Sequence, residues 1–583
     1  MAYFDPTVSG TSIIDPVNRI EGHLRVDMQV NNGRVSDAWV TGGLFRGMEL
    51  ILEGREPTDA AYITQRICGV CPVSHAHASC FAGEGSYGIT IPNTARIIRN
   101  IVEGSQFLHS HILWFYNLAA LDYVNPLEPV LSVLNTAGTA VDETKAKKLA
   151  GDALDLAHAA GTSPADFTNL LKRLAVFALN GQMSIFSGNW FDGKDAAYQL
   201  PTALNLIATA HYLEALEMQA VASEISGIIG GKMPHIMSSI PGGTTFVPSP
   251  QNLDDILFRV RRIKDWVANT MIPDTYAIAP FYLDVAAYGV GVKRYIAWGV
   301  FDRENRVPSN RYLPGGVWGF ADGANRVADW NEELITESTI RAWYGDDGKA
   351  VNPRSGITEP HYPSDTPSSY ARNGKYTWSK APRYDGKPYE AGGLARLLVA
   401  YNKGNSFVKT NVDKLLAHLS AAAGATLGAE ALASTLGRTA ARNIETLYIA
   451  TMMEDWVLEL IEALKRGDSA SFVEPKHYTG EGAGLWEAPR GAIYHYEKIK
   501  NGKIEKYQII IPSTWNISPR DAQGARGPME EALIGVPVAD LDKPIHALRT
   551  VHSFDPCIAC AVHISEPATG KTFSTVTSPW GVK

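Results

Sequence analysis

Two Cys-x-x-Cys pairs stand at opposite ends of this 583-residue chain, Cys68 with Cys71 and Cys557 with Cys560. They use four of its five cysteines. Each such turn can deliver two thiolates to one ion, and thiolates are soft ligands that favour Zn, Fe, Ni or Cu(I). Because the entropy cost of closing a loop grows only logarithmically with its length, a packed core can bring the two turns together. The pattern therefore predicts one shared four-sulfur metal site.

The composition is that of a folded protein with no affinity for nucleic acid. Apolar residues make up 45% of the chain and charged residues 20%, and the formal net charge is −8. Such a chain lacks the basic surface that attracts nucleic acid, so no nucleic-acid partner is expected. The first residues show neither a cationic segment nor an apolar core, and no uninterrupted run of about 18 apolar residues follows. We therefore expect no signal peptide and no membrane-spanning helix.

Cysteine usage indicates a reducing compartment. Two pairs plus Cys80 do not form the scattered pattern of a secreted disulfide framework. The paired thiols are expected to bind metal in a protein made in the cytoplasm. Cys80 is expected to be a small buried apolar residue.

Hairpin signals lie near both ends of the chain. Alternating apolar and polar residues flank Asn31-Asn32-Gly33 in one region and Asn501-Gly502 in the other. The strands are expected at 23–30, 34–40, 492–498 and 504–511. Residues 300–390 are rich in Gly, Pro, Asp, Asn, Trp and Tyr, which predicts a lobe of loops and short strands.

Long helices are expected between these ends. Apolar residues recur at three- and four-residue spacing in four segments: 94–123, 200–229, 253–271 and 436–465. Helices of such length bury their apolar faces against one another in a bundle. The expected fold class is α+β, mainly helical, with a long-helix bundle core, peripheral β-hairpins and a loop-rich lobe.

On spacing alone, structural zinc is the leading interpretation of the four cysteines, since four thiolates complete a tetrahedral zinc site. An iron–sulfur cluster comes next, because four thiolates also hold one. The residues around the two turns change this order.

The first turn lies in 66–75, RICGVCPVSH, and the second in 555–563, DPCIACAVH. These resemble the paired signatures of the large, catalytic subunit of nickel–iron hydrogenases, of the uptake type. Further resemblance runs in the family's order through DPVNRIEGH, FRGME, HYLEAL, APRG and PSTWN, at 15–23, 45–49, 211–216, 488–491 and 512–516. The likeness covers nearly the whole chain and implies the fold of that subunit.

The resemblance implies a nickel ion held by all four thiolates, with Cys68 and Cys557 terminal on nickel and Cys71 and Cys560 bridging to iron. In the family, one carbon monoxide and two cyanides complete the iron. The implied reaction is the reversible conversion of H2 to protons and electrons, here respiratory uptake of H2. Splitting H2 near neutral pH needs a Lewis acid and a base that takes the proton. Glu21 matches the carboxylate that passes the proton outward from Cys557.

Other residues that match positions in the family are expected around the four-thiolate metal site, called the cage below. Arg490 matches a guanidinium that overhangs the metals, and Asp555 matches the carboxylate that orients it. Pro489 is expected to shape the pocket, and His75 to hydrogen-bond a bridging thiolate. A guanidinium loses a proton reluctantly, so the role of Arg490 as a base is the weaker interpretation.

The chain departs from the family on the helix near the metals. Where the family commonly has His-Asp-His and later His-Phe-Tyr, this chain has His-Ser-His and Trp-Phe-Tyr, with Ser110 and Trp114 at the changed positions. A hydroxyl thus replaces the carboxylate expected beside the arginine. We expect Ser110→Asp to change turnover or inhibition.

The resemblance also implies a second, hard metal ion. Glu49, the main-chain carbonyl of Ile517 and the imidazole of His563 match the ligands of a Mg or similar ion in the family. Oxygen ligands suit such an ion, and retained water would complete its octahedron.

The end of the chain resembles an unprocessed precursor. We expect one catalytic domain over 1–563 and an extension, 564–583, that a nickel-dependent endopeptidase removes after metal insertion with a maturation chaperone. A permanent C-terminal strand is the alternative, because 571–578 contains β-forming residues.

Electron transfer requires a partner. With four cysteines committed and Cys80 left over, the chain cannot build a series of iron–sulfur clusters. The family implies an obligate small subunit that carries them, with a membrane cytochrome b as a further candidate partner. Co-export with that subunit would place the protein on the periplasmic face of the membrane.

Two other classes of function are compatible with the sequence. A regulatory H2 sensor would hold the same metals with low turnover, although intact sensors often lack a removable tail. A structural zinc scaffold with four cysteine ligands would hold zinc without nickel or iron, since architecture alone does not establish catalysis.

Overall fold

The computed structural model describes residues 5–186, 196–321, 326–345, 347–361, 374–475 and 479–558. Cys560, His563 and the extension 564–583 lie outside these residues. Across the described ranges, no helix combines the length and apolar character needed to cross a membrane.

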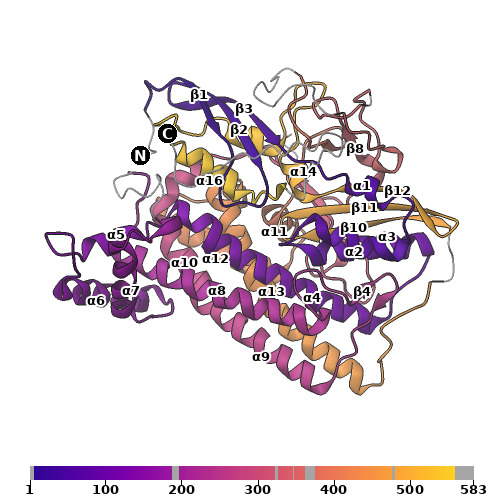
Figure 1. Ribbon diagram of the computed structural model, residues 1–583, viewed down its shortest axis with the longest axis horizontal. Helices are drawn as coiled ribbons and strands as arrows, with labels where there is room; N and C mark the ends of the chain where they lie inside the picture. The colour runs from indigo at the N-terminus through magenta and orange to yellow at the C-terminus, as the bar shows by residue number, and fades with distance from the viewer. Residues whose placement is uncertain are drawn as a thin grey trace.

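Four long helices form the centre of the molecule, as the periodicity predicts. They lie side by side in Figure 1: α4 (Asn93–Ile112), α8 (Thr202–Gly230), α9 (Pro250–Trp266) and α13 (Thr435–Lys465). The segments expected at 94–123 and 253–271 each continue past the α-helix into a π-helical segment, Leu113–Ala119 and Val267–Met271. The apolar pattern therefore predicts the buried face of these segments but not the change in hydrogen bonding at their ends.

Both expected hairpins are confirmed, and each gains a third strand. The first sheet has the order β1-β2-β3 and the second β10-β11-β12, all antiparallel. Their strands are β1 (Gly10–Ile14), β2 (Leu24–Asn31), β3 (Arg34–Gly42), β10 (Gly480–Ala488), β11 (Gly491–Lys500) and β12 (Lys503–Ile510). Strand β10 was not predicted because three of its nine residues are glycine, which weakens the strand signal.

Shorter elements surround the bundle and the sheets (Figure 1). The helices are α1 (Met48–Leu52), α2 (Pro57–Thr64), α3 (Pro72–Tyr87), α5 (Leu127–Ser132), α6 (Glu143–Ala160), α7 (Phe167–Leu179), α10 (Ile272–Ile278), α11 (Gly393–Asn402), α12 (Ser406–Ala423), α14 (Pro512–Asn516), α15 (Pro528–Leu533) and α16 (Ile545–Ser553). The short strand pairs are β4 (Ser239–Ile240) with β5 (Gly243–Thr244), β6 (Arg294–Ala297) with β7 (Gly316–Gly319), and β8 (Ile335–Ser338) with β9 (Ala381–Tyr384). The described part of 300–390 thus consists of loops and short strands, as expected, together with three short 3-10 helices.

Two described segments that are far apart in the sequence meet at Glu21 and Cys557. The backbone at Glu21 forms a parallel bridge with Cys557, and the Ile558 N–H donates to the Glu21 carbonyl at 2.7 Å. Because the loop after β1 and the segment after α16 share this contact, the fold brings the second Cys-x-x-Cys turn to the N-terminal part of the chain.

Candidate metal centre

Two of the four paired thiols, Cys68 and Cys557, meet in the interior. Their Sγ atoms lie 3.4 Å apart, and the two residues are 1% and 0% exposed. A disulfide would require about 2.05 Å, whereas two sulfurs on one ion, each about 2.3 Å from it, can lie up to about 4.6 Å apart. The separation fits two ligands of a shared ion.

The first turn is shaped so that Cys68 faces inward. Its Sγ accepts backbone N–H groups from Val70 at 3.3 Å and Cys71 at 3.2 Å. Cys71 is itself buried and precedes Pro72, the first residue of α3. Accepting two N–H groups favours the thiolate form of Cys68, which is the form that binds metal.

The described residues do not complete a metal site by themselves. Among them, no group of three or more His, Cys, Asp or Glu side chains converges closely enough to hold an ion. The fourth expected thiol, Cys560, lies outside these residues. The buried donor set that is described, all sulfur, nevertheless fits a soft metal such as nickel and not a hard ion.

Glu21 reaches the cage through its side chain as well as its backbone. The Cys557 Sγ donates to Glu21 Oε2 at 3.2 Å. On the other side, the Cys557 N–H donates to the hydroxyl of Ser513 at 3.0 Å. Ser513 had no predicted role, although it lies in the PSTWN motif, because the sequence does not show which residue receives that N–H.

Arg490 is buried beside the thiols. Its Nη2 lies 3.0 Å from Asp555 Oδ1, and its Nη1 donates to the Ser110 hydroxyl at 3.5 Å. Burial lowers the pKa of Arg490, but Asp555 and the nearby cysteine thiolates outweigh it and raise that pKa well above its ordinary value. The guanidinium therefore stays charged. The neighbouring Pro489 is buried, and its carbonyl accepts from Arg396 at 2.8 Å.

A second guanidinium, that of Arg442, lies beside this group and was not predicted. It lies 4.4 Å from the centre of the Trp114 ring, and the Trp114 indole N–H donates to the His552 carbonyl at 3.0 Å. Burial lowers the pKa of Arg442 to about 10, and the attraction of Asp555 opposes this effect in part. Trp114, one of the two family departures, thus packs against a cation that also interacts with Asp555.

His75 lies on α3, four residues after Cys71. Its Nδ1 lies 3.3 Å from Nε2 of His495, while its Nε2 has no hydrogen-bond partner among the described residues. Burial lowers the pKa of His75 to about 4, so the ring is neutral. No described contact joins His75 to a thiol, so the expected hydrogen bond to a bridging thiolate stays a prediction.

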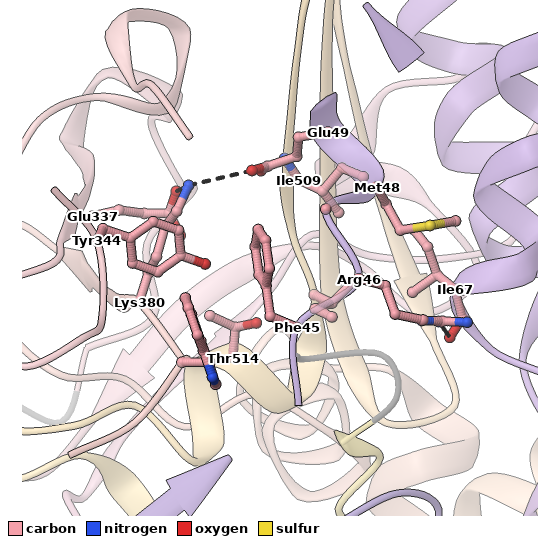
Figure 2. Close-up of a pocket in the computed structure, with 13 residues that line it drawn as sticks. Phe45, Arg46, Met48, Glu49, Ile67, Glu337, Tyr344, Lys380, Ile509 and Thr514 are labelled. Carbon is pink, nitrogen blue, oxygen red and sulfur yellow. Dashed lines mark hydrogen bonds and ion pairs between the residues drawn. The ribbon is translucent and has the colours of Figure 1, made fainter. Parts of the chain in front are cut away.

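The expected hard-metal site contains Glu49 in a small cavity shown in Figure 2. The cavity has a volume of about 70 Å³, and Glu49, Glu337 and Lys380 are among the residues that line it. Glu49 accepts the Ile509 N–H at 2.8 Å and lies 3.5 Å from the ammonium of Lys380. Burial raises the pKa of Glu337 to about 7. The cavity is thus already lined by two cations, Arg46 and Lys380, and two carboxyl groups.

The other two expected ligands are not brought to Glu49 by described contacts. Ile517 is buried at the end of α14, whose Thr514 lines the cavity. His563 lies outside the described residues. The carboxylate fits a hard ion, but the ligand set stays a prediction.

Comparison with known proteins adds independent evidence. The family model described as nickel-dependent hydrogenase matches residues 46–563, and one described as HoxL-like matches residues 12–41. The chain is 38% identical to the Hydrogenase-2 large chain of Escherichia coli K12, over 94% of this chain and 96% of that protein. It is also 38% identical to the uptake hydrogenase large subunit of Bradyrhizobium diazoefficiens, over 95% of each chain.

Solved structures agree with this relationship. The Ni-Fe-Se hydrogenase of D. vulgaris Hildenborough superposes with a TM-score of 0.76 and 33% identity, over 95% of this chain and 100% of that chain. The [NiFeSe]-hydrogenase of Dm. baculatum gives a TM-score of 0.77 and 32% identity, over 95% and 100%. The expected α+β hydrogenase fold is therefore confirmed, and this chain belongs to the nickel-dependent hydrogenase family as a large subunit.

Proposed function

We propose that the protein catalyses reversible heterolytic oxidation of H2 to protons and electrons, acting in the cell as a respiratory H2-uptake hydrogenase. The observation that carries this proposal is the meeting of the Cys68 and Cys557 sulfurs at 3.4 Å, with a carboxylate 3.2 Å from Cys557. A structural zinc site has no use for that carboxylate, because four thiolates already satisfy zinc. A reaction that releases protons uses such a carboxylate as a proton acceptor.

The ligands of the proposed centre are Cys68, Cys71, Cys557 and Cys560. A nickel–iron centre held there would supply the electron-poor metal that polarises H2. Cys557 is placed to take the proton on its Sγ and pass it to Glu21 Oε2, which lies within hydrogen-bond reach. Arg490 keeps a fixed positive charge at the cage, held by Asp555 at 3.0 Å. Burial of the described thiols and of Arg490 excludes bulk water and strengthens these interactions.

Several finer features belong to the same proposal. We propose one carbon monoxide and two cyanides on iron, and a Mg or similar ion at Glu49, Ile517 and His563. The carboxylate of Glu49 and the small size of its cavity support the ion. Lys380, 3.5 Å from Glu49, would have to move or lose its proton when a divalent cation binds.

The names of the relatives, large chain and large subunit, imply a small-subunit partner. We propose that this subunit holds iron–sulfur clusters, that a membrane cytochrome b receives the electrons, and that the complex lies at the periplasmic face of the membrane. A cytoplasmic maturation chaperone and endopeptidase would act first. Removal of 564–583 would let the segment after Cys557 pack inward.

Mass spectrometry of protein purified in fully active form tests whether the extension 564–583 is removed. The mature chain should end at His563. A fully active sample that retains 564–583 would contradict the processing proposal.

The metal assignment is tested with two matched cysteine variants in the complex with its partner. Cys68→Ala should lose nickel and H2-dependent dye reduction. Cys80→Ala should keep both, because Cys80 is buried on α3 with its thiol pKa raised by burial to about 12 and belongs to neither pair. Equal nickel content in the two variants would contradict the proposed cage.

A further inference from the structure

A short series of hydrogen-bonding side chains begins at His75 and runs away from the thiol cage. His75 Nδ1 lies 3.3 Å from His495 Nε2, and His495 Nδ1 lies 2.8 Å from the Tyr507 hydroxyl. The three residues come from α3, β11 and β12 and are 0% exposed. Each ring nitrogen in the series except His75 Nε2 therefore has one partner.

The two imidazoles are neutral. They face each other directly, and two adjacent cations without a carboxylate partner would repel each other. Burial lowers the pKa of His75 to about 4 and lowers the pKa of His495 well below its ordinary value. A neutral imidazole carries one N–H, so a hydrogen bond at one nitrogen decides what the other nitrogen can do.

The hydroxyl of Tyr507 determines which atoms donate and which accept along this series of hydrogen bonds. Burial raises its pKa well above 10, with a further contribution from Glu497 that outweighs the lowering effect of the Ser79 hydroxyl, so the O–H is retained. Glu497 lies opposite Tyr507 in the sheet, but neither of its oxygens has a hydrogen-bond partner among the described residues. His495 Nδ1 is the acceptor that the described contacts give the Tyr507 O–H, and a buried O–H is costly to leave unpaired, so Tyr507 donates to His495 Nδ1 and the hydrogen of His495 is on Nε2. That N–H then donates to His75 Nδ1, so the hydrogen of His75 is on Nε2.

His75 lies close to the described thiols. It follows Cys71, the N-cap residue of α3, by four residues, so it lies about one helical turn from that thiol. Cys68 is close enough to raise the pKa of His75 against the effect of burial. A buried N–H that has no partner and lies near thiolates can donate a hydrogen bond to one of their sulfurs.

We propose that Tyr507 and His495 are positioning residues that fix the tautomer of His75, so that His75 donates its Nε2 hydrogen to a thiolate of the metal cage. This inference rests on the proposed metal centre and adds two residues to it. A donated hydrogen bond withdraws electron density from the sulfur, and so from the metals that the sulfur binds. The sequence offers no signal for this arrangement, because 420 residues separate His75 from His495.

Infrared spectroscopy of the complex with its partner tests the inference. The wild-type protein must first show bands of iron-bound carbon monoxide and cyanide, and their absence would count against the proposed function itself. In Tyr507→Phe and His495→Leu, the carbon monoxide band should move to lower wavenumber, because the thiolate no longer shares charge with a donor. Nickel retention or turnover should fall about 10-fold, as for other residues that orient metal-site groups.

Two variants serve as controls. His495→Gln should keep the wild-type bands, because a carboxamide oxygen can accept from Tyr507 while its NH2 group donates to His75. Tyr295→Phe should also leave them unchanged, because the buried Tyr295 hydroxyl has no hydrogen-bond partner in the described structure. Wild-type bands in both Tyr507→Phe and His495→Leu would overturn the inference. A shift of the carbon monoxide band in His495→Gln equal to that in His495→Leu would also overturn it. This comparison tests the inference even if Tyr507→Phe does not fold.

Discussion

Glu21 and Cys557 are joined twice, by a main-chain bridge and by the 3.2 Å contact between carboxylate and sulfur. The main-chain contact holds the two residues together whatever the side chain at 21 is. A substitution there can therefore separate proton transfer from assembly of the site.

Glu21→Gln keeps the size of the side chain but cannot accept and release a proton. We expect turnover to fall by about 10²- to 10⁴-fold, the usual contribution of a positioned proton acceptor. Nickel and iron content should equal that of the wild type. Steady-state H2 oxidation together with metal analysis measures both, and wild-type turnover in this variant would rule out Glu21 as the proton acceptor.

The variant Ser110→Asp tests whether the hydroxyl that replaces the family's carboxylate beside Arg490 affects the metal centre. Its hydroxyl lies 3.5 Å from Arg490 Nη1, so Ser110→Asp would place a negative charge against that guanidinium. Added negative charge stabilises the oxidised form of a metal centre, so its midpoint potential should become more negative, by on the order of 50 mV. Electrochemical titration measures this shift. An unchanged potential and unchanged kinetics would mean that the position is incidental.

Among the secondary-structure elements, α3 carries His75, follows directly on Cys71 and packs on β10. At Gly484 of β10, a Cβ atom would lie 1.9 Å from the carbonyl oxygen of Ala78 on α3. Glycine is therefore required for the helix to approach the strand this closely. The position of the first Cys-x-x-Cys turn depends on that approach.

Gly484→Ala should destabilise the protein by about 1–3 kcal/mol, because backbone must shift to make room. Gly227→Ala, on α8, is the matched control, since beyond the surrounding turn of its own helix no atom lies within 4 Å of the added Cβ there. That control should be neutral or stabilising by up to about 1 kcal/mol, because alanine favours a helix over glycine. Thermal unfolding of both variants gives the comparison, and equal effects would contradict the packing argument.

A buried ion pair connects α8 to α10. His211 Nδ1 lies 2.8 Å from Asp274 Oδ2, and His211 Nε2 lies 2.9 Å from the Ser163 carbonyl oxygen. Burial lowers the pKa of His211, but Asp274 outweighs it and raises that pKa to about 9. Because the folded-state pKa lies above the ordinary value of 6.5, the pair contributes its full stability below pH 6.5, and that stability is lost as the pH rises through 9.

The contribution should be about 3 kcal/mol at pH 6. Removing the titrating group in His211→Gln should therefore lower the melting temperature strongly at pH 6 and much less at pH 10. His158→Gln, at an exposed position on α6, controls for loss of a histidine. A pH-independent difference between wild type and His211→Gln would show that the pair is not an ion pair.

Across the whole molecule, periodicity and turn signals predicted the four long helices and both hairpins, because these depend on spacing within a short stretch of chain. The third strand β10 was missed, since its glycines serve close packing against α3 and give no strand signal. At the centre, motif resemblance indicated Cys68, Cys557, Glu21 and Arg490, which the fold brings together. It could not indicate Arg442 or His495, whose contacts with Asp555 and His75 join elements far apart in the sequence.

The central claim is that two distant thiol pairs hold nickel and iron for H2 oxidation. Infrared spectroscopy combined with metal analysis, on mature protein purified with its small subunit, tests it most directly. We predict nickel and iron on the large subunit, with bands of iron-bound carbon monoxide and cyanide in a region where protein does not absorb. A folded, mature sample that contains zinc at these thiols, without nickel and without those bands, would contradict the account.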